Sequence, residues 1–189
     1  MADFEIISTI RNFSQVCDYT FTSIPQTYKH LYIIGTGGDS NSNYGATGKW
    51  KLLFNGDTGS NWNVSNWASM NQTTNNRQVQ VSNEANNYIA RTPTQFTFSG
   101  DCGFEIWIPN YSSNSSGQPA KCFSLKQFGP MQESSNGDGA VARHMNAVFR
   151  PSGWSGMTSG SAAITEVKLS SVNGCFTYGN HISLYGVKG

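Results

Sequence analysis

The stretch Phe104-Glu105-Ile106-Trp107-Ile108 indicates the fold class, because its residues alternate along the chain. A two-residue period is typical of a β-strand that buries one face and leaves the other toward solvent. Phe104, Ile106 and Ile108 are therefore expected on one side of a strand. Glu105 and Trp107 are expected on the opposite side.

Similar β-type runs occur from one end of the chain to the other. Residues 29–34 are almost continuously apolar, so coverage of both faces of that strand is expected. No segment has convincing helical periodicity, although residues 61–70 could hold a short turn. Further strands are predicted at 5–10, 17–22, 50–54, 96–98, 122–127, 140–150, 164–170 and 181–187.

Turn residues separate these runs. Asn55-Gly56 and Asn136-Gly137 are pairs that tolerate the positive φ of tight turns, and the second pair marks the clearest hairpin. Residues 35–48 and 56–76 are long, polar and loop-like. We therefore predict an all-β protein in which residues 1–189 form one antiparallel β-sandwich of about ten strands with long polar loops.

Composition excludes some partners. Among 189 residues there are 12 Lys+Arg and 11 Asp+Glu, and only 12% of positions are charged. Nucleic-acid binding needs clustered basic residues, so we expect no nucleic-acid partner. No apolar run is long enough to span a bilayer, and the first residues lack the features of a signal peptide. We therefore expect neither membrane insertion nor export.

The four cysteines are Cys17, Cys102, Cys122 and Cys175, and they lie far apart in the sequence. There is no C-x-x-C pair and no histidine at ligand spacing. Four cysteines are enough for two disulfides. Without an export signal, however, the expectation is reduced thiols packed in strands.

Patterns for catalysis and metal binding are weak. Glu105 resembles the acid-bearing strand of some β-sandwich glycosidases, but it is the one acid on its strand face, and glycoside hydrolysis uses two. Residues 39–45 resemble a calcium loop, yet the glycine falls one place late and Trp50 stands where a bidentate Glu belongs. We predict no catalytic residue, no metal and no cofactor. A depolymerase that uses Glu105 with another acid is the alternative.

Aromatic residues in loop-like, amide-rich contexts are the candidate contact residues. Aromatic rings beside amides and hydroxyls suit stacking on sugars or a protein interface. Three interpretations stay open for them: a cap on one end of the sandwich, a protein interface and a sugar site. The candidates are Tyr44, Trp62, Trp67, Tyr111 and Trp154.

Four segments resemble sequence motifs of tailed-phage virion proteins. Residues 21–31, FTSIPQTYKHL, resemble the signature F-x-x-I-P-x-T-Y-x-H-L near the start of many of these proteins. Residues 182–189, ISLYGVKG, resemble their closing L-Y-G-I-K strand. Residues 53–61 are similar to their F-N-G-D-x-x-x-N turn, and residues 161–167 to their A-I-T-S-I strand. The four matches occur in the same order and span Phe21 to Gly189.

This resemblance implies a jelly-roll-like β-sandwich on the surface of a phage particle, often a homotrimer, with no catalytic residue. Such domains serve as capsid decoration (cement) proteins, head fibres or tail-fibre tips. The signature begins close to residue 1, with no anchoring domain or shaft before it, which favours decoration. We therefore expect a non-enzymatic virion structural protein, made in the host cytoplasm, that stabilises the head.

The expected partners are the major capsid protein or other virion proteins. The alternative is a tail- or head-fibre tip that binds a host surface glycan or receptor.

Overall fold

The computed structural model describes residues 3–38, 48–56, 62–72, 75–80, 88–92, 102–113, 121–133, 137–149, 162–171, 175–176 and 179–189. Their regular secondary structure is β-strand throughout, with no helix among them. Side chains are described for residues 3–38, 50–56, 103–113, 121–127, 162–171, 175–176 and 179–189. The prediction of an all-β protein is therefore confirmed for the described part of the chain.

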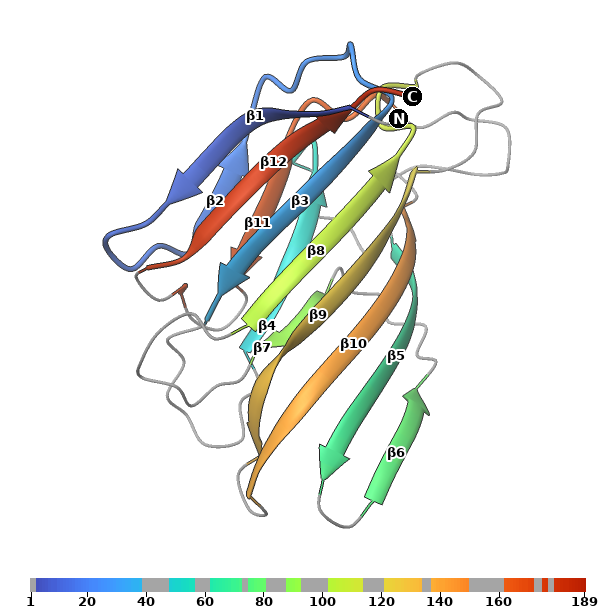
Figure 1. The fold of residues 1–189 in the computed structure, drawn as a ribbon. Helices are drawn as coiled ribbons and strands as arrows, with labels where there is room; N and C mark the ends of the chain where they lie inside the picture. The colour runs from blue at the N-terminus through green and yellow to red at the C-terminus, as the bar shows by residue number, and fades with distance from the viewer. Residues whose placement is uncertain are drawn as a thin grey trace.

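The strands form two antiparallel sheets (Figure 1). The large sheet has the order β1-β12-β3-β8-β9-β10-β5-β6, and the small sheet has the order β2-β11-β4-β7. The strands are β1 (Phe4–Arg11), β2 (Asp18–Phe21), β3 (His30–Gly37), β4 (Gly48–Phe54), β5 (Trp62–Gln72), β6 (Asn75–Gln80), β7 (Tyr88–Thr92), β8 (Cys102–Pro109), β9 (Lys121–Glu133), β10 (Gly137–Phe149), β11 (Val167–Ser171) and β12 (His181–Val187).

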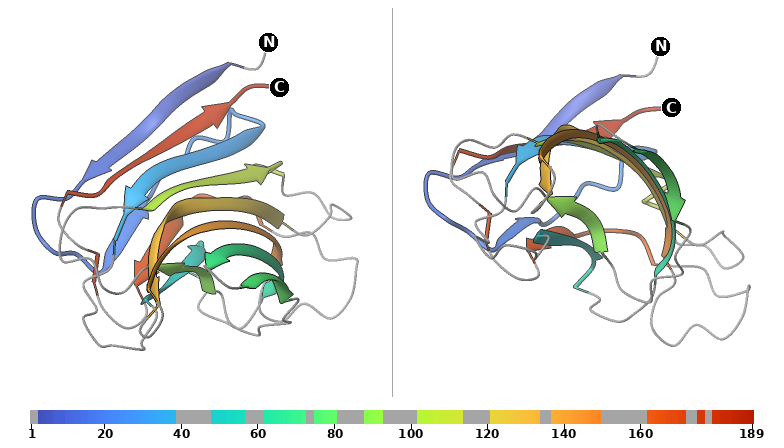
Figure 2. Two further views of the ribbon diagram at one scale, coloured as in Figure 1. Left: turned by 60° about the horizontal axis from the view of Figure 1, so that its bottom comes forward. Right: turned by 90° about the horizontal axis from the view of Figure 1, so that it is seen from below.

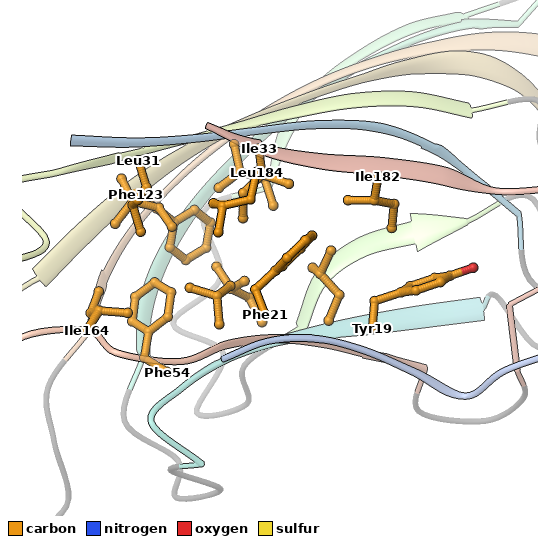
Figure 3. Close-up of a cluster of buried hydrophobic side chains, with 14 of the residues drawn as sticks. Tyr19, Phe21, Leu31, Ile33, Phe54, Phe123, Ile164, Ile182 and Leu184 are labelled. Atoms are coloured by element: carbon orange, nitrogen blue, oxygen red, sulfur yellow. The ribbon is translucent and has the colours of Figure 1, made fainter. Parts of the chain in front are cut away.

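The large sheet curves over the small one (Figure 2). Apolar side chains of both sheets fill the space between them. Phe104, Ile106 and Ile108 are buried there, as their alternation predicts. Burying one such side chain contributes about 1.5 to 3 kcal/mol. Figure 3 shows the facing layers, which include Leu31, Ile33, Ile182 and Leu184 from the large sheet and Tyr19, Phe21 and Phe54 from the small sheet.

Two turn predictions agree with the structure. Asn55 and Gly56 follow β4 with φ angles of 51° and 70°. β9 and β10 form the predicted antiparallel hairpin, and its ladder already includes the pair Gly137 and Glu133. The Asn-Gly pairs therefore place these connections correctly, although Gly137 itself lies in a strand.

The expectation of a long polar loop over residues 56–76 is wrong. Residues 62–72 and 75–80 form β5 and β6, which extend the large sheet beyond β10. β5 pairs with β10 continuously from Trp62 opposite Phe149 to Asn71 opposite Ala140. A polar sequence becomes a strand here because a neighbouring strand supplies its hydrogen-bond partners, which outweighs a low intrinsic preference for β-structure. The predicted strand at 96–98 lies outside the described residues.

The expectation of reduced cysteines is wrong for two of the four. Cys17 and Cys175 form a disulfide across a sequence separation of 158 residues. Both lie just outside strands, in the connections from β1 to β2 and from β11 to β12. Their distance in sequence hid the pairing, because the antiparallel pairing of the two ends of the chain brings them together. Cys122, in β9, is a free and half-buried thiol.

Candidate functional site

Asn55, in the segment that resembles the F-N-G turn, binds the irregular segment just before β11, where the A-I-T-S-I motif was predicted to be a strand. Its side-chain oxygen accepts hydrogen bonds from the backbone N–H groups of Thr165 at 2.8 Å and Glu166 at 3.1 Å. Its side-chain nitrogen donates to the carbonyl of Ala163 at 2.8 Å. The Asn55 side chain therefore connects two segments that are more than a hundred residues apart in the sequence.

The first and last motif segments also pack on each other. The Tyr28 ring lies against Gly186, so closely that a Cβ added to this glycine would collide with it. The backbone N–H of Lys29 donates to the carbonyl of Val187 at 3.0 Å. These motif residues therefore hold the two ends of the chain together within the fold.

A row of aromatic residues crosses the side of the large sheet that faces away from the small sheet. Tyr185 on β12 pairs with Tyr32 on β3, which pairs with Trp107 on β8. The centroid of the Tyr32 ring lies 6.3 Å from each of the other two centroids. Directly opposed residues of neighbouring strands share a face, so the three rings form one continuous strip.

Apolar side chains extend this strip toward the sheet edge. Ile6 on β1 pairs with Tyr185, and the Phe4 ring meets the Tyr32 ring edge-on at 5.7 Å. Phe4, Ile6 and Ile34 are 54%, 61% and 42% exposed, so coverage of both faces of residues 29–34 is not observed. We call the outer face the set Phe4, Ile6, His30, Tyr32, Ile34, Glu105, Trp107, Lys126 and Tyr185.

Glu105 is fixed at the centre of the outer face by two donors. The Tyr32 hydroxyl donates to one carboxylate oxygen at 2.6 Å, and the Lys126 ammonium lies 2.8 Å from the other. The hydrogen bonds from Lys126 and Tyr32 lower the pKa of Glu105 below its ordinary value. Burial and the bond to Glu105 raise the pKa of Tyr32 to about 12. At neutral pH the outer face therefore presents an oriented carboxylate, an ammonium group and a phenol.

The pKa of Glu105 is shifted in the direction opposite to that of a typical general acid. A general acid needs a raised pKa, whereas the pKa of Glu105 is lowered. His30 uses Nδ1 to accept a hydrogen bond from the backbone N–H of Asn110 at 3.1 Å. No cluster of three His, Cys, Asp or Glu side chains that could hold a metal ion occurs among the described residues. Asp39 to Gly45, the calcium-like loop, lies outside them.

The prediction that Tyr111 is a contact residue is wrong. Tyr111 is fully buried, its hydroxyl donates to the carbonyl of Pro25, and its own carbonyl accepts from the N–H of Ile164 at 2.9 Å. Tyr111 does lie in a turn just after β8, as expected, but its side chain is packed into the core. The ring therefore stabilises the junction of three segments and has no exposed surface.

The two tryptophans predicted in a polar loop lie in β5 instead. Position 67 pairs with His144, which pairs with Lys126, so it belongs to a row that also contains Glu105. Position 62 pairs with Phe149, which pairs with the buried Lys121. The other two candidates, Tyr44 and Trp154, lie outside the described residues.

Sequence reasoning missed most of the outer face, although one signal was present. The alternation of residues 104–108 already placed Glu105 and Trp107 together on the side away from the core. Tyr32 and Ile34 alternate in the same way with the buried Leu31 and Ile33. What the sequence did not give was the strand order that brings β12, β3 and β8 side by side.

In the part of the chain that the structure describes, no helix has the length and apolar character needed to cross a membrane. No family model, curated protein or solved structure matches the chain.

Proposed function

We propose that this chain is a non-enzymatic virion structural protein, a capsid decoration (cement) protein on the outside of a phage head. Its outer face docks on the major capsid protein or another virion protein and stabilises the shell. The fold is a jelly-roll-like β-sandwich with two hairpin additions.

The strand order supports the jelly-roll assignment. A jelly roll is an antiparallel ribbon rolled up so that strands from the two ends of the chain alternate in two four-stranded sheets. Rolling gives the neighbours β1-β12-β3-β8 in one sheet and β2-β11-β4-β7 in the other, as in this chain. β5 and β6 follow β4, β9 and β10 follow β8, and all four lengthen the first sheet.

The observation that carries the docking role is the exposed apolar surface of the outer face. Ile6 and Phe4 keep more than half of their surface in water, and Ile34 keeps 42%. Protein interfaces are enriched in aromatic residues, as is the strip from Tyr185 to Trp107. The charges of Glu105 and Lys126 beside this strip are paired with each other. A contiguous exposed apolar patch is a hazard for a free protein unless a partner covers it.

Low charge and repetition fit the same role. Only 12% of residues are charged, so little of a contact made by this chain depends on ion pairs that salt screens. Copies of a decoration protein share a symmetric shell, and a homotrimer would bind through several outer faces at once. Each single contact can then be modest while the whole assembly stays bound.

The test uses particles made without this chain, to which purified protein is added back. Wild-type protein is expected to sediment with heads. Ile6→Thr and Ile34→Thr keep β-branched residues but remove exposed apolar surface, so they are expected to weaken binding by about tenfold or more. Phe13→Ser is the matched control, because Phe13 is 91% exposed but lies on the loop after β1.

Unchanged binding of Ile6→Thr and Ile34→Thr would remove the outer face from the contact. Binding to tails alone would overturn decoration. Light scattering on the free protein tests the homotrimer separately.

A second candidate is a fibre tip that binds a host glycan on the same face. The specific observation is Glu105, whose carboxylate is oriented by Tyr32 and Lys126 beside the Trp107 ring. Sugars are recognised by an aromatic ring against their C–H face and by fixed donors and acceptors for their hydroxyls. This arrangement supplies both.

Glycan-array binding distinguishes the two candidates. The glycan role predicts binding that is lost in Trp107→Ala and weakened in Tyr32→Phe, which keeps the ring but removes one of the two donors that orient Glu105. Phe13→Ser is again the control. Wild-type protein that binds no glycan, or Trp107→Ala that binds as well as wild type, contradicts this role.

A further inference from the structure

The Cys17–Cys175 disulfide joins the two connections in which the chain crosses between the sheets at its two ends. Cys17 lies between β1 of the large sheet and β2 of the small sheet. Cys175 lies between β11 of the small sheet and β12 of the large sheet. One covalent bond therefore ties both crossings together, and it closes a loop that includes most of the chain.

Non-covalent contacts hold the two crossings together without the sulfur atoms. Val16 and Phe176 form a β-bridge, with an N–H to O distance of 2.6 Å in one direction and 3.4 Å in the other. The N–H of Ser171 donates to the carbonyl of Cys17 at 2.9 Å. Backbone hydrogen bonds therefore hold Phe176, the residue after Cys175, against Val16, the residue before Cys17. The backbone alone brings the two thiols close to each other.

The core anchors the same segment. Phe176 is fully buried, and its ring centroid lies 4.5 Å from that of Tyr19 and 4.7 Å from that of Trp50. These contacts involve no sulfur and are available to the reduced chain. We propose that Cys17 and Cys175 form a redox-dependent clamp, which closes on an already folded protein once the protein leaves a reducing compartment.

The chemistry of the clamp needs an oxidant, and a small-molecule disulfide such as oxidised glutathione supplies it. The Cys17 or Cys175 thiolate attacks this disulfide and releases one small thiol. The second protein thiolate then attacks the mixed disulfide, forms the Cys17–Cys175 bond and releases the other small thiol. Two protein thiols are oxidised, and one small disulfide is reduced to two thiols.

The clamp also controls the loop that carries Phe13, the most exposed large apolar side chain among the described residues. This loop is closed by the N–H of Asn12 donating to Asn180 at 3.3 Å and the N–H of Gly179 donating to Asn12 at 2.9 Å. Cys17 and Cys175 flank these bonds in the two crossings. Reduction is therefore expected to loosen this corner first and to leave the pairing of β3 with β8 intact.

Linkage makes the proposal quantitative. If the disulfide raises the equilibrium constant for folding by some factor, folding raises the equilibrium constant for forming the disulfide by the same factor. Cross-linking a loop of this length lowers the entropy of the unfolded chain by an amount that corresponds to a melting-temperature shift of about 10 to 20 °C for a protein of this size. In a glutathione redox buffer, the ratio of disulfide to dithiol should accordingly be at least about a hundredfold higher in native buffer than in urea.

The experiment compares the full-length protein in oxidised and reduced form. Alkylation and intact mass give the number of free thiols, circular dichroism gives the fold and the melting temperature, and hydrogen exchange reports on individual amides. The reduced protein is expected to keep its β-sheet spectrum, to melt about 10 to 20 °C lower, and to exchange faster at Asn12 and Gly179. The double variant Cys17→Ser/Cys175→Ser should have the melting temperature of the reduced protein, and adding reductant should not change it.

Cys122→Ser is the matched control, because it also removes a thiol but leaves the clamp. It should keep the full difference between oxidised and reduced protein. Three results would overturn the proposal: a reduced protein without β-structure, equal melting temperatures in both redox states, or a glutathione equilibrium that is the same in urea and in native buffer. The clamp can fail these tests whether or not the chain is a virion protein.

Discussion

Asn55 combines a special backbone conformation with a set of side-chain hydrogen bonds. Its φ of 51° lies in the left-handed region, which asparagine tolerates better than most residues. Its amide group binds backbone atoms of Ala163, Thr165 and Glu166. Both properties are needed at this position, and only asparagine supplies both easily.

Two substitutions separate these contributions. Asn55→Gly keeps the conformation but removes the hydrogen bonds, and we expect it to lower the free energy of unfolding by about 1 to 3 kcal/mol. Asn55→Ala also loses the hydrogen bonds but, unlike glycine, keeps a Cβ in the left-handed region, so it should cost about 1 kcal/mol more than Asn55→Gly. Urea denaturation measures both values. A variant Asn55→Ala as stable as Asn55→Gly would contradict the conformational part.

At the scale of elements, β12 and the segment before β3 depend on the absence of one side chain. A Cβ at position 186 would overlap the Tyr28 ring. Gly186→Ala is therefore expected to destabilise the protein by about 1 to 3 kcal/mol, through displacement of that ring. Adding Tyr28→Ser should recover part of the loss, because the alanine then has room. Thermal unfolding of the single and double variants gives the interaction energy, and strict additivity would contradict this contact.

The strands with an apolar alternation or run could be predicted from the sequence, and the polar strands β5 and β6 could not. The alternation in 104–108 and the apolar run in 29–34 were sufficient for β8 and β3. β5 has few apolar residues in alternation, and its pairing with β10 depends on a strand about eighty positions later.

The outer face could not be predicted for the same reason, because it depends on which strands lie side by side. Trp107 was placed correctly relative to the core, but its neighbours Tyr32 and Tyr185 come from strands that only the strand order brings together. Burial of Tyr111 likewise follows from a contact with Pro25, which is distant in sequence.

At the scale of the whole molecule, a buried lysine contributes to the pH dependence of stability. Lys121 is almost fully buried, and its ammonium group donates to the carbonyls of Asn110, at 2.8 Å, and of Ser113. Burial lowers the pKa of Lys121 from 10.5 to about 8, a shift that the nearby Cys122 opposes. Between these two values the unfolded chain holds more protons than the folded protein, so this group adds stability as pH rises.

The corresponding measurement is the melting temperature of wild type and of Lys121→Met at pH 7 and pH 10. Lys121→Met removes two hydrogen bonds and should be less stable at both values. The wild-type advantage should be larger at pH 10, since only the wild type gains from the loss of the proton. If the difference in melting temperature between wild type and Lys121→Met stays constant or shrinks from pH 7 to pH 10, the lowered pKa of Lys121 is contradicted.

We propose that the outer face docks this chain on the outside of a phage head. Electron cryo-microscopy of purified particles, with and without the protein, tests it most directly. The predicted result is density for a two-sheet unit on the head surface, with Ile6, Ile34 and Trp107 turned toward the shell. Density confined to the tail, or a head-bound unit whose outer face is turned to solvent, would contradict the claim.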